Sequence, residues 1–572
     1  MTRLIMVIGF FFSVTHVIDG QSNPPSTSQS NSPRYQEVVY LQVNSSFLLV
    51  GESVLFNAYC VNSITNMPSD LSKVLNVELI NEGAVSVLNA KILMKDGRGY
   101  GDFFLPSTLS SGNYTLLAYT NWMRNFPGQS FFRTQVTVIN PFKKPSAVTS
   151  IQANRPVTTK SKDNSPQISK SGFDFSLERK SFKTREKVKM NLSLNDTVGA
   201  NLSVSVRKID RLISSAMDSS SLPGVEPSAS SNALPIAYLP EVRGNLLTGW
   251  VRKHKKTVPV AGEMVYLSVP SKDYLFLTSV TDSQGRFYFN SNQAKFTTEA
   301  VLQIDSASCG DCEITVDEQG LDDYAFSKPT PLLIDSSFRK LIEERSLISQ
   351  IENAYYSQKQ DSLLDRSSAS RFYGKADYTY RLDDYVRFPA MEDILIEFIS
   401  EIVLRKRDGN FEIKVKDART RETYEKNPLI LIDGIPVFDV KTVLHYDPLL
   451  VEKVEVVGKR YFYGALEIQG IISISTYDGA GKNIPSLKKE KYRGVQLRKK
   501  YFSPDYTVPS TRDRIPDYRL QLYWNPSVFV SVRPRSIEFF TSDLPGDFEV
   551  VIFGIGNDGH IIYHRDIIHV GR

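Results

Sequence analysis

The chain has 572 residues, which predicts about three to six domains at roughly 100–200 residues per domain. A hydrophobic share of 41% and a charged share of 23% are typical of folded domains and argue against a disordered chain. The net charge of +5 is small for this length, so nucleic-acid binding finds little support, and three cysteines exclude a disulfide-rich scaffold.

The N-terminus reads MTRLIMVIGFFFSVTHVIDGQSNPPS, a basic residue followed by a short apolar run. This pattern predicts a signal peptide over 1–20 and hence an exported protein. A buried or membrane helix is the alternative reading, but the run is shorter than the ~20 residues that a helix needs to span a bilayer. No cysteine lies near the expected cleavage point, so a lipid-anchored N-terminus is not expected.

Several β-rich segments follow a polar linker over 21–34. Residues 35–141 alternate apolar and polar positions between turn signals, which is typical of a β-sandwich. A linker rich in Lys, Ser, Thr and Pro is predicted over 142–172. A second β module that contains a Ser/Pro loop is predicted over 173–236, and another β-sandwich over 237–330.

The hydrophobic period then changes. Apolar residues in DSSFRKLIEERSLISQIENAYY recur at near-helical spacing, which predicts a helical connector over 331–375. The helix-like stretch MEDILIEFISEI and several short strands predict a small α+β domain over 376–479. A basic run over 480–500 is either a solvated linker or a contact for lipid head groups or anionic glycans. A last β-sandwich is predicted over 501–572, so the fold class is mainly β: tandem β-sandwich modules plus one small α+β domain.

The α+β segment resembles the plug domain of TonB-dependent outer-membrane receptors. The similarity lies in PLILIDGIPV and in DPLLVEKVEVVGKRYFYGALEIQGIISISTY, although LEIQG stands where plugs usually have small residues and paired glycines. The residues that carry the plug motif are Asp433, Gly434, Pro436, Pro448, Glu452, Gly464 and Gly470. The chain after Asp478 is too short for a barrel of about 22 strands, so we expect a plug without a barrel of its own.

Two further resemblances concern the sandwiches. LLVGESVLFNAYCVN and GNYTLLAYTNWMRN resemble a macroglobulin-type domain, but no cysteine matches the Cys-x-x-Gln thioester motif of macroglobulin protease traps. GWVRKHKKTVPVAGEMVYL and TDSQGRFYF resemble a carboxypeptidase regulatory-like, Ig-like domain. The series of domains resembles exported Bacteroidota proteins, which implies a place at the outer membrane, in the periplasm or on the cell surface. The last stretch, DLPGDFEVVIFGIGNDGHIIYHRDIIHVGR, resembles a type IX sorting domain or simply the end of a sandwich.

Few residues suggest chemistry. Cys309 and Cys312 allow a redox motif, half a zinc site or a local disulfide; the strand-and-turn context and the lack of nearby ligands favour the disulfide. His560, His564 and His569 lie in a predicted strand, where the first two share a face and the third points away, so they do not predict a metal site. We therefore predict no catalytic, cofactor-binding or metal-binding residues, and no cofactor.

These observations predict a non-enzymatic, exported interaction or scaffold protein. It would dock on an outer-membrane β-barrel protein, a TonB-linked transporter or a ligand through its plug-like and β-sandwich domains, with peripheral membrane association. One alternative is a macroglobulin-like protease-binding or inhibitory protein without a thioester, whose bait would be the Ser/Pro loop 214–236. Another alternative is an accessory ligand-binding protein that feeds a separate TonB-dependent transporter.

Overall fold

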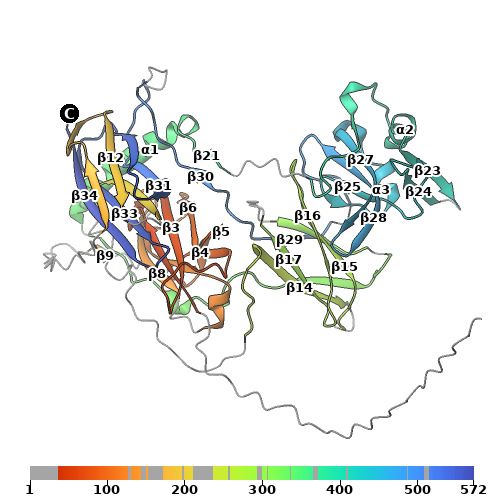
Figure 1. The fold of residues 1–572 in the computed structure, drawn as a ribbon, viewed down its shortest axis with the longest axis horizontal. Coiled ribbons are helices and arrows are strands. Elements are labelled where there is room, and N and C mark those ends of the chain that lie inside the picture. Colours follow the sequence, from red (N-terminus) through yellow and green to blue (C-terminus); the bar gives the residue numbers. More distant parts are fainter. Residues whose placement is uncertain are drawn as a thin grey trace, which may run out of the picture. The chain divides into compact units, whose positions relative to one another are not determined.

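The computed structural model is mainly β, which confirms the predicted fold class (Figure 1). It describes residues 36–126, 131–143, 150–151, 172–195, 199–209, 236–254, 258–292, 299–305, 307–334, 336–364, 371–407, 410–485, 487–507 and 514–571. The predicted signal peptide, the linker 21–34, most of the linker 142–172 and nearly all of the Ser/Pro loop lie outside the described residues. Within these ranges no helix has both the length and the apolar character to cross a membrane.

The first sandwich packs two antiparallel-rich sheets face to face. One sheet has the order β1-β3-β6 and the other β2-β8-β7-β4-β5. The strands are β1 (Glu37–Val43), β2 (Phe47–Leu49), β3 (Ser53–Asn62), β4 (Val74–Ile80), β5 (Ser86–Leu93), β6 (Arg98–Phe104), β7 (Gly112–Tyr119) and β8 (Phe132–Ile139). Alternate apolar residues such as Val54, Phe56 and Ala58 on β3 enter the core because successive side chains of a strand point to opposite faces.

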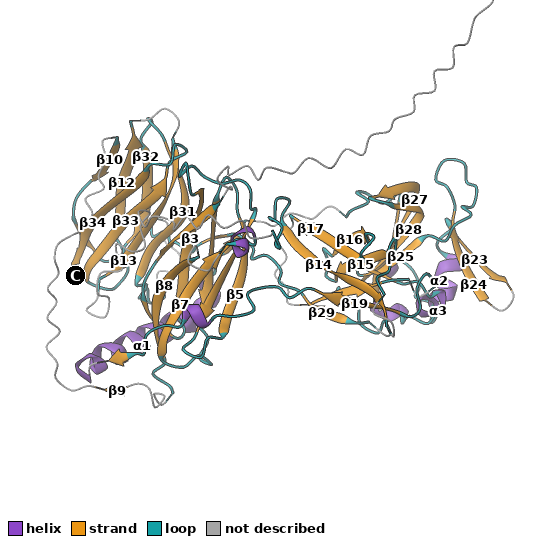
Figure 2. Cartoon of the chain, turned by 90° about the horizontal axis from the view of Figure 1, so that it is seen from below, coloured by secondary structure: helices purple, strands orange, loops and turns teal. Residues whose placement is uncertain are grey.

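A second sandwich, here called the composite sandwich, combines strands from two distant parts of the chain (Figure 2). Its sheets have the orders β10-β12-β32 and β11-β34-β33-β13-β31. The strands are β10 (Phe173–Leu177), β11 (Ser181–Lys183), β12 (Lys187–Leu194), β13 (Ala200–Lys208), β31 (Gln521–Val530), β32 (Arg535–Phe540), β33 (Gly546–Ile555) and β34 (Ile561–Gly571).

The composite sandwich corrects the prediction of two separate modules over 173–236 and 501–572. Strand β12 pairs with β32, and β13 lies between β31 and β33, so each half supplies strands to both sheets. Side-chain alternation specifies that a strand has a buried face but not which strand lies beside it. The two halves therefore look like independent sandwiches in the sequence, although neither covers its own apolar face.

The middle sandwich has sheets of order β17-β14-β19 and β16-β15-β18-β29. Its strands are β14 (Asn245–Lys253), β15 (Met264–Val269), β16 (Leu275–Val280), β17 (Arg286–Ser291), β18 (Glu299–Gln303), β19 (Cys312–Val316) and β29 (Lys489–Lys491). Strand β29 belongs to the segment predicted as a solvated linker, and Tyr492, 3% exposed, joins the core of this sandwich. That prediction is corrected because β29 pairs with β18 and Tyr492 fills the core, although the lysines of β29 themselves are exposed.

The α+β domain has a five-stranded sheet of order β22-β27-β28-β25-β26, with helices α2 and α3 packed on one face (Figure 2). Its elements are β22 (Tyr378–Arg381), α2 (Met391–Glu397), β23 (Ile402–Arg407), β24 (Asn410–Val415), β25 (Leu429–Ile432), β26 (Ile435–Pro436), α3 (Val440–Leu444), β27 (Val451–Tyr463) and β28 (Leu466–Thr476). Short 3-10 helices also occur: η1 (Trp122–Asn125), η4 (Ala325–Ser327), η5 (Ser336–Phe338), η6 (Tyr356–Gln358), η7 (Leu382–Asp384) and η8 (Pro448–Leu450). Short pairs β9 (Ser150–Ile151) with β20 (Leu333–Ile334) and β21 (Ser362–Leu363) with β30 (Lys499–Lys500) connect segments.

Helix α1 (Arg339–Ala354) forms where the near-helical spacing predicts a helix. Its buried residues are Arg345, Ser346 and Ser349, whereas Leu347 is 59% exposed. The buried face of the helix is therefore largely polar, and Ile342 adds an apolar contact with a cluster that contains Leu49 and Ile139. Arg345 donates from Nε and Nη2 to the two carboxylate oxygens of Glu52, at 2.9 and 2.8 Å, and this ion pair joins the helix to the first sandwich.

Candidate functional site

The Asp-Gly turn of the plug motif is a buried anchor. Asp433 is 1% exposed, and its carboxylate accepts hydrogen bonds from the backbone N–H and the hydroxyl of Thr476 and from the N–H of Gly481. Both turn residues have positive φ, 50° for Asp433 and 85° for Gly434, which Asp and Gly tolerate better than other residues. The side chain of Asp433 therefore joins the turn after β25 to the end of β28.

Gly434 is where the middle sandwich meets the α+β domain. A Cβ atom added to Gly434 would lie 2.3 Å from the ring of Tyr274, so only glycine allows this approach. The Tyr274 hydroxyl lies 3.2 Å from Ser473 Oγ, and the guanidinium of Arg371 lies 4.2 Å from the Tyr274 ring centroid. The turn thus serves as an internal docking point.

The same contact continues across the sheet face that α2 and α3 leave uncovered. Residues of β15 and β16 form one buried apolar cluster with residues of β25, β27 and β28; its buried members are Tyr266, Tyr274, Phe276, Tyr373, Leu431, Val457, Ile468 and Ile471. Gly464, in the turn between β27 and β28, lies near Thr278. The chain's own middle sandwich therefore covers this face of the α+β domain.

Of the other plug-motif residues, Glu452 makes a second contact with the middle sandwich, whereas Gly470 and Pro448 lie elsewhere in the α+β domain. Gly470, at φ 90°, leaves room for Val415, and a Cβ there would lie 2.6 Å from the Val415 Cβ. The buried Pro448 accepts a hydrogen bond from Arg387 at its carbonyl, whereas Glu452 lies 3.8 Å from Lys272. Pro436 lines a groove described next. The seven residues thus hold the domain together at separate places and form no single site.

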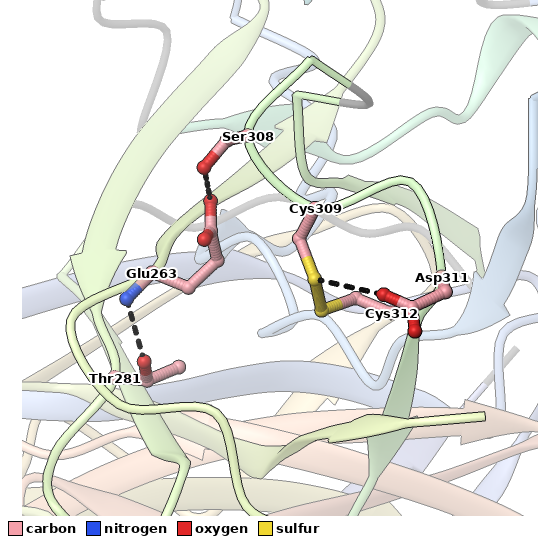
Figure 3. Close-up of a disulfide and its surroundings, with 6 residues drawn as sticks. All are labelled: Glu263, Thr281, Ser308, Cys309, Asp311 and Cys312. Carbon is pink, nitrogen blue, oxygen red and sulfur yellow. Dashed lines mark hydrogen bonds between the residues drawn. A yellow bond between two sulfur atoms is a disulfide. The ribbon is translucent and has the colours of Figure 1, made fainter. Parts of the chain in front are cut away.

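A groove of about 1110 Å³ lies between the turn of the middle sandwich that contains the two cysteines and the segment after β25. Phe438, Thr442 and Lys488 line one side, and Cys309, Cys312 and neighbouring residues line the other. Cys309 and Cys312 form a disulfide, and Figure 3 shows Asp311 beside it, with its Oδ1 atom 3.7 Å from Cys309 Sγ. Nearby, Ser308 donates to Glu263, whose N–H donates to Thr281 (Figure 3).

The disulfide can be tested by counting the cysteines that react with a thiol reagent. Cys60 is fully buried, and burial raises the pKa of its thiol well above the usual range, so we expect the native protein to react with iodoacetamide at no cysteine. Unfolding without a reductant should add one label at Cys60, and unfolding with a reductant should add three. Intact-mass spectrometry measures these counts. Labelling of Cys309 or Cys312 without a reductant would contradict the bond.

The three C-terminal histidines have separate surroundings. His560 pairs with Asp558 and His569 with Asp547. His564 packs against Phe173 and Phe175, and burial there lowers its pKa. In the described ranges the one grouping with metal-ligand spacing is Cys309, Asp311 and Cys312, whose two sulfur atoms are joined to each other.

An exposed apolar surface on the α+β domain had no signal in the sequence. Val386 is 85% exposed, Leu449 67%, Tyr477 43% and Tyr385 42%; we call these four residues the apolar patch. Arg387 joins the three segments that carry them, because it donates to the carbonyls of Pro448 and Val451 and to the Tyr477 hydroxyl. The four residues come from three segments, with only Tyr385 and Val386 adjacent, so the fold brings these segments together.

No family model matches the chain, and no curated protein matches it. Among solved structures it is similar to Salmonella alpha-2-macroglobulin reacted with methylamine, at 8% identity and a TM-score of 0.24, over 94% of this chain and 40% of that one. It is also similar to Escherichia coli alpha-2-macroglobulin activated by porcine elastase, at 10% identity and a TM-score of 0.25, over 94% and 44%. The chain spans less than half the length of these structures.

Proposed function

We propose that the protein is an exported, non-enzymatic interaction protein whose α+β domain docks on a β-barrel protein of the outer membrane. The observation that carries this proposal is the apolar patch, where four large apolar side chains stand exposed on one small domain. Clusters of this kind on otherwise polar surfaces are typical of protein–protein contacts. The export signal and the plug resemblance support the location and the kind of partner.

Both faces of the sheet in the α+β domain are covered by other parts of the chain, which limits the surface that a partner can bind. Tyr274 and its neighbours already occupy the face formed by β25, β27 and β28, whereas helices α2 and α3 occupy the opposite face. A partner must therefore use the rim of the domain, where η7, η8 and the end of β28 meet. The apolar patch lies on this rim.

The charges around the apolar patch indicate which charges the partner's surface should carry. Asp383 and Asp384 are exposed beside Tyr385. Hydrogen bonds from Tyr477 and Arg387 hold the pKa of Asp383 below its usual range, so this carboxylate stays charged at neutral pH. We therefore expect the patch to bind an apolar surface that is bordered by basic side chains.

Cross-linking of the tagged protein in intact cells of its native host, followed by mass spectrometry of linked peptides, tests the proposal. We expect links from residues 376–479 to an outer-membrane β-barrel protein. The double substitution Val386→Glu and Leu449→Glu should abolish them, because two charges would enter an apolar contact. The matched control is Val85→Glu, at a valine that is 55% exposed on the first sandwich, and it should leave the links unchanged.

Two results would overturn the proposal. Links confined to the chain itself would remove the barrel partner and leave the protease-binding alternative as the one to test, by cleavage of the Ser/Pro loop 214–236. Links to a barrel protein that survive the double substitution would show that another surface makes the contact.

A further inference from the structure

A second hollow, partly open to solvent, lies between the first sandwich and the middle sandwich. Its volume is about 520 Å³, within the range of roughly 300–1,000 Å³ that is typical of small-molecule sites. Side chains from β5, β7 and η1, from the segment before β14, and from β14 and β17 line it. We call it the polar cavity.

Aromatic rings that are held in place line the polar cavity. Trp250 donates from Nε1 to Asp317 Oδ1 at 3.0 Å, and the same carboxylate accepts from Thr248 and from Arg286. The Arg286 guanidinium lies 4.4 Å from the Trp250 ring centroid. These contacts fix the indole before any ligand arrives.

Tyr238 is fixed in a similar way on the other side of the cavity. The Arg124 guanidinium lies 3.8 Å from the Tyr238 ring centroid and donates from Nη1 to Asn121 Oδ1 at 3.0 Å. Tyr288 on β17 adds a further ring to the lining. Rigid aromatic walls lower the entropy cost of binding, because few side chains must be ordered.

The lining also holds a buried carboxylate that is only half satisfied. Glu241 is 2% exposed, and its Oε1 atom accepts from the N–H of Leu246 at 3.1 Å and lies 3.5 Å from Lys91 Nζ. Its Oε2 atom has no hydrogen-bond partner among the residues that the structure describes. An unpaired buried carboxylate oxygen is costly, and solvent does not reach Oε2 in this structure, so a hydroxyl donor would have to displace neighbouring side chains to satisfy it.

The charges of the lining nearly cancel. Its cations are Lys91, Arg124 and Arg286. Its carboxylates are Glu241, Asp317, Glu318 and Asp322. A phosphate or carboxylate ligand would face four acids and only three bases, which argues against an anion. A neutral ligand with several hydroxyls can donate to Glu241 and accept from the amides and guanidinium groups.

We propose that the polar cavity binds a neutral sugar. Hydroxyl groups match the mixed donors and acceptors, and the apolar C–H face of a sugar ring packs against aromatic rings. The polar cavity and the apolar patch share no residues, so the sugar-binding proposal does not depend on the proposed docking on a barrel protein.

Saturation-transfer NMR on the full chain tests the proposal. The probes are glucose, galactose, mannose, xylose and N-acetylglucosamine, compared with glucose 6-phosphate and glucuronate. We expect transfer to at least one neutral sugar and none to the two anions. Tyr238→Ala and Tyr288→Ala should each weaken the binding roughly five-fold, because each removes one aromatic contact.

Two further variants complete the test. Glu241→Gln keeps the size of the side chain but removes the charge that pairs with the buried Lys91, so we expect a lower thermal unfolding midpoint together with weaker sugar binding, measured well below that midpoint. Tyr385→Ala, in the apolar patch, should bind sugar like the unaltered chain. No transfer to any neutral sugar would overturn the proposal, as would stronger transfer to the anions or binding that Tyr238→Ala and Tyr288→Ala leave unchanged.

Discussion

Replacing Arg345 with methionine should destabilise the first sandwich and release helix α1 from it. The substitution removes the bidentate partner of the buried Glu52 and leaves it with Arg207, whose Nη2 atom lies 3.6 Å from Glu52 Oε2; the side chains of Arg345 and Glu52 are 3% and 11% exposed. Removing one member of a buried ion pair costs about 3–5 kcal/mol. Thermal unfolding and hydrogen exchange of peptides over 47–56 and 339–354 would measure the loss.

Two controls isolate the ion pair. Arg339→Met removes a partner of Glu343 from the same helix, but both side chains are exposed, so no measurable change is expected. The double substitution Glu52→Gln with Arg345→Met should cost less than Arg345→Met alone, because it leaves no buried charge in that pair. A double variant as unstable as the single one would show that Arg345 acts through packing.

The same pair predicts a pH dependence. Burial by itself would raise the pKa of Glu52, but the charge and hydrogen bonds of Arg345, together with the charge of Arg207 and the N–H of Leu49, outweigh it and hold the pKa below its usual range. A depressed folded-state pKa contributes stability that is present at neutral pH and lost as the pH falls through that pKa. The unaltered chain should therefore lose this contribution in acid, whereas the double variant should show no such loss.

Replacing Tyr274 with alanine should separate the α+β domain from the middle sandwich. Tyr274 is 6% exposed and contacts Gly434, Ser473 and Arg371. Truncating a buried aromatic residue costs about 3–5 kcal/mol, and here the cavity would open in the contact between two domains. We expect faster hydrogen exchange in β25 and β26 together with β15 and β16, whereas the composite sandwich keeps its protection.

Two variants test whether the contact itself is responsible. Tyr356→Ala removes a tyrosine that is 55% exposed, and exchange should not change. Gly434→Ala changes the other side of the contact. The added Cβ would clash with the Tyr274 ring, and Gly434 has a positive φ that favours glycine. It should therefore reproduce the exchange pattern of Tyr274→Ala. Faster exchange confined to β15 and β16 would mean that the α+β domain does not depend on this contact.

Local patterns could be predicted from the sequence because their causes are local. The Asp433-Gly434 turn, helix α1 and helix α2 form where turn residues and helical spacing indicate them. Helix α1 also shows the limit of such patterns. Its apolar residues have helical spacing, and of these Ile342 packs against the cluster with Leu49 and Ile139. The most buried residue of the helix, however, is Arg345, which pairs with the carboxylate of Glu52 on the first sandwich.

The sequence by itself determined the fold class, the turns and the positions of the helices, since these depend on neighbours along the chain. The tertiary structure alone decided which distant strands pair, as β12 with β32 and β13 with β31, and which residues gather around Arg387 or around the polar cavity. The physical reason is that the alternation of apolar and polar residues shows which face of a strand is buried but does not specify which strand pairs with it. Both proposed binding surfaces consist of residues far apart in the chain, so only the folded protein assembles them.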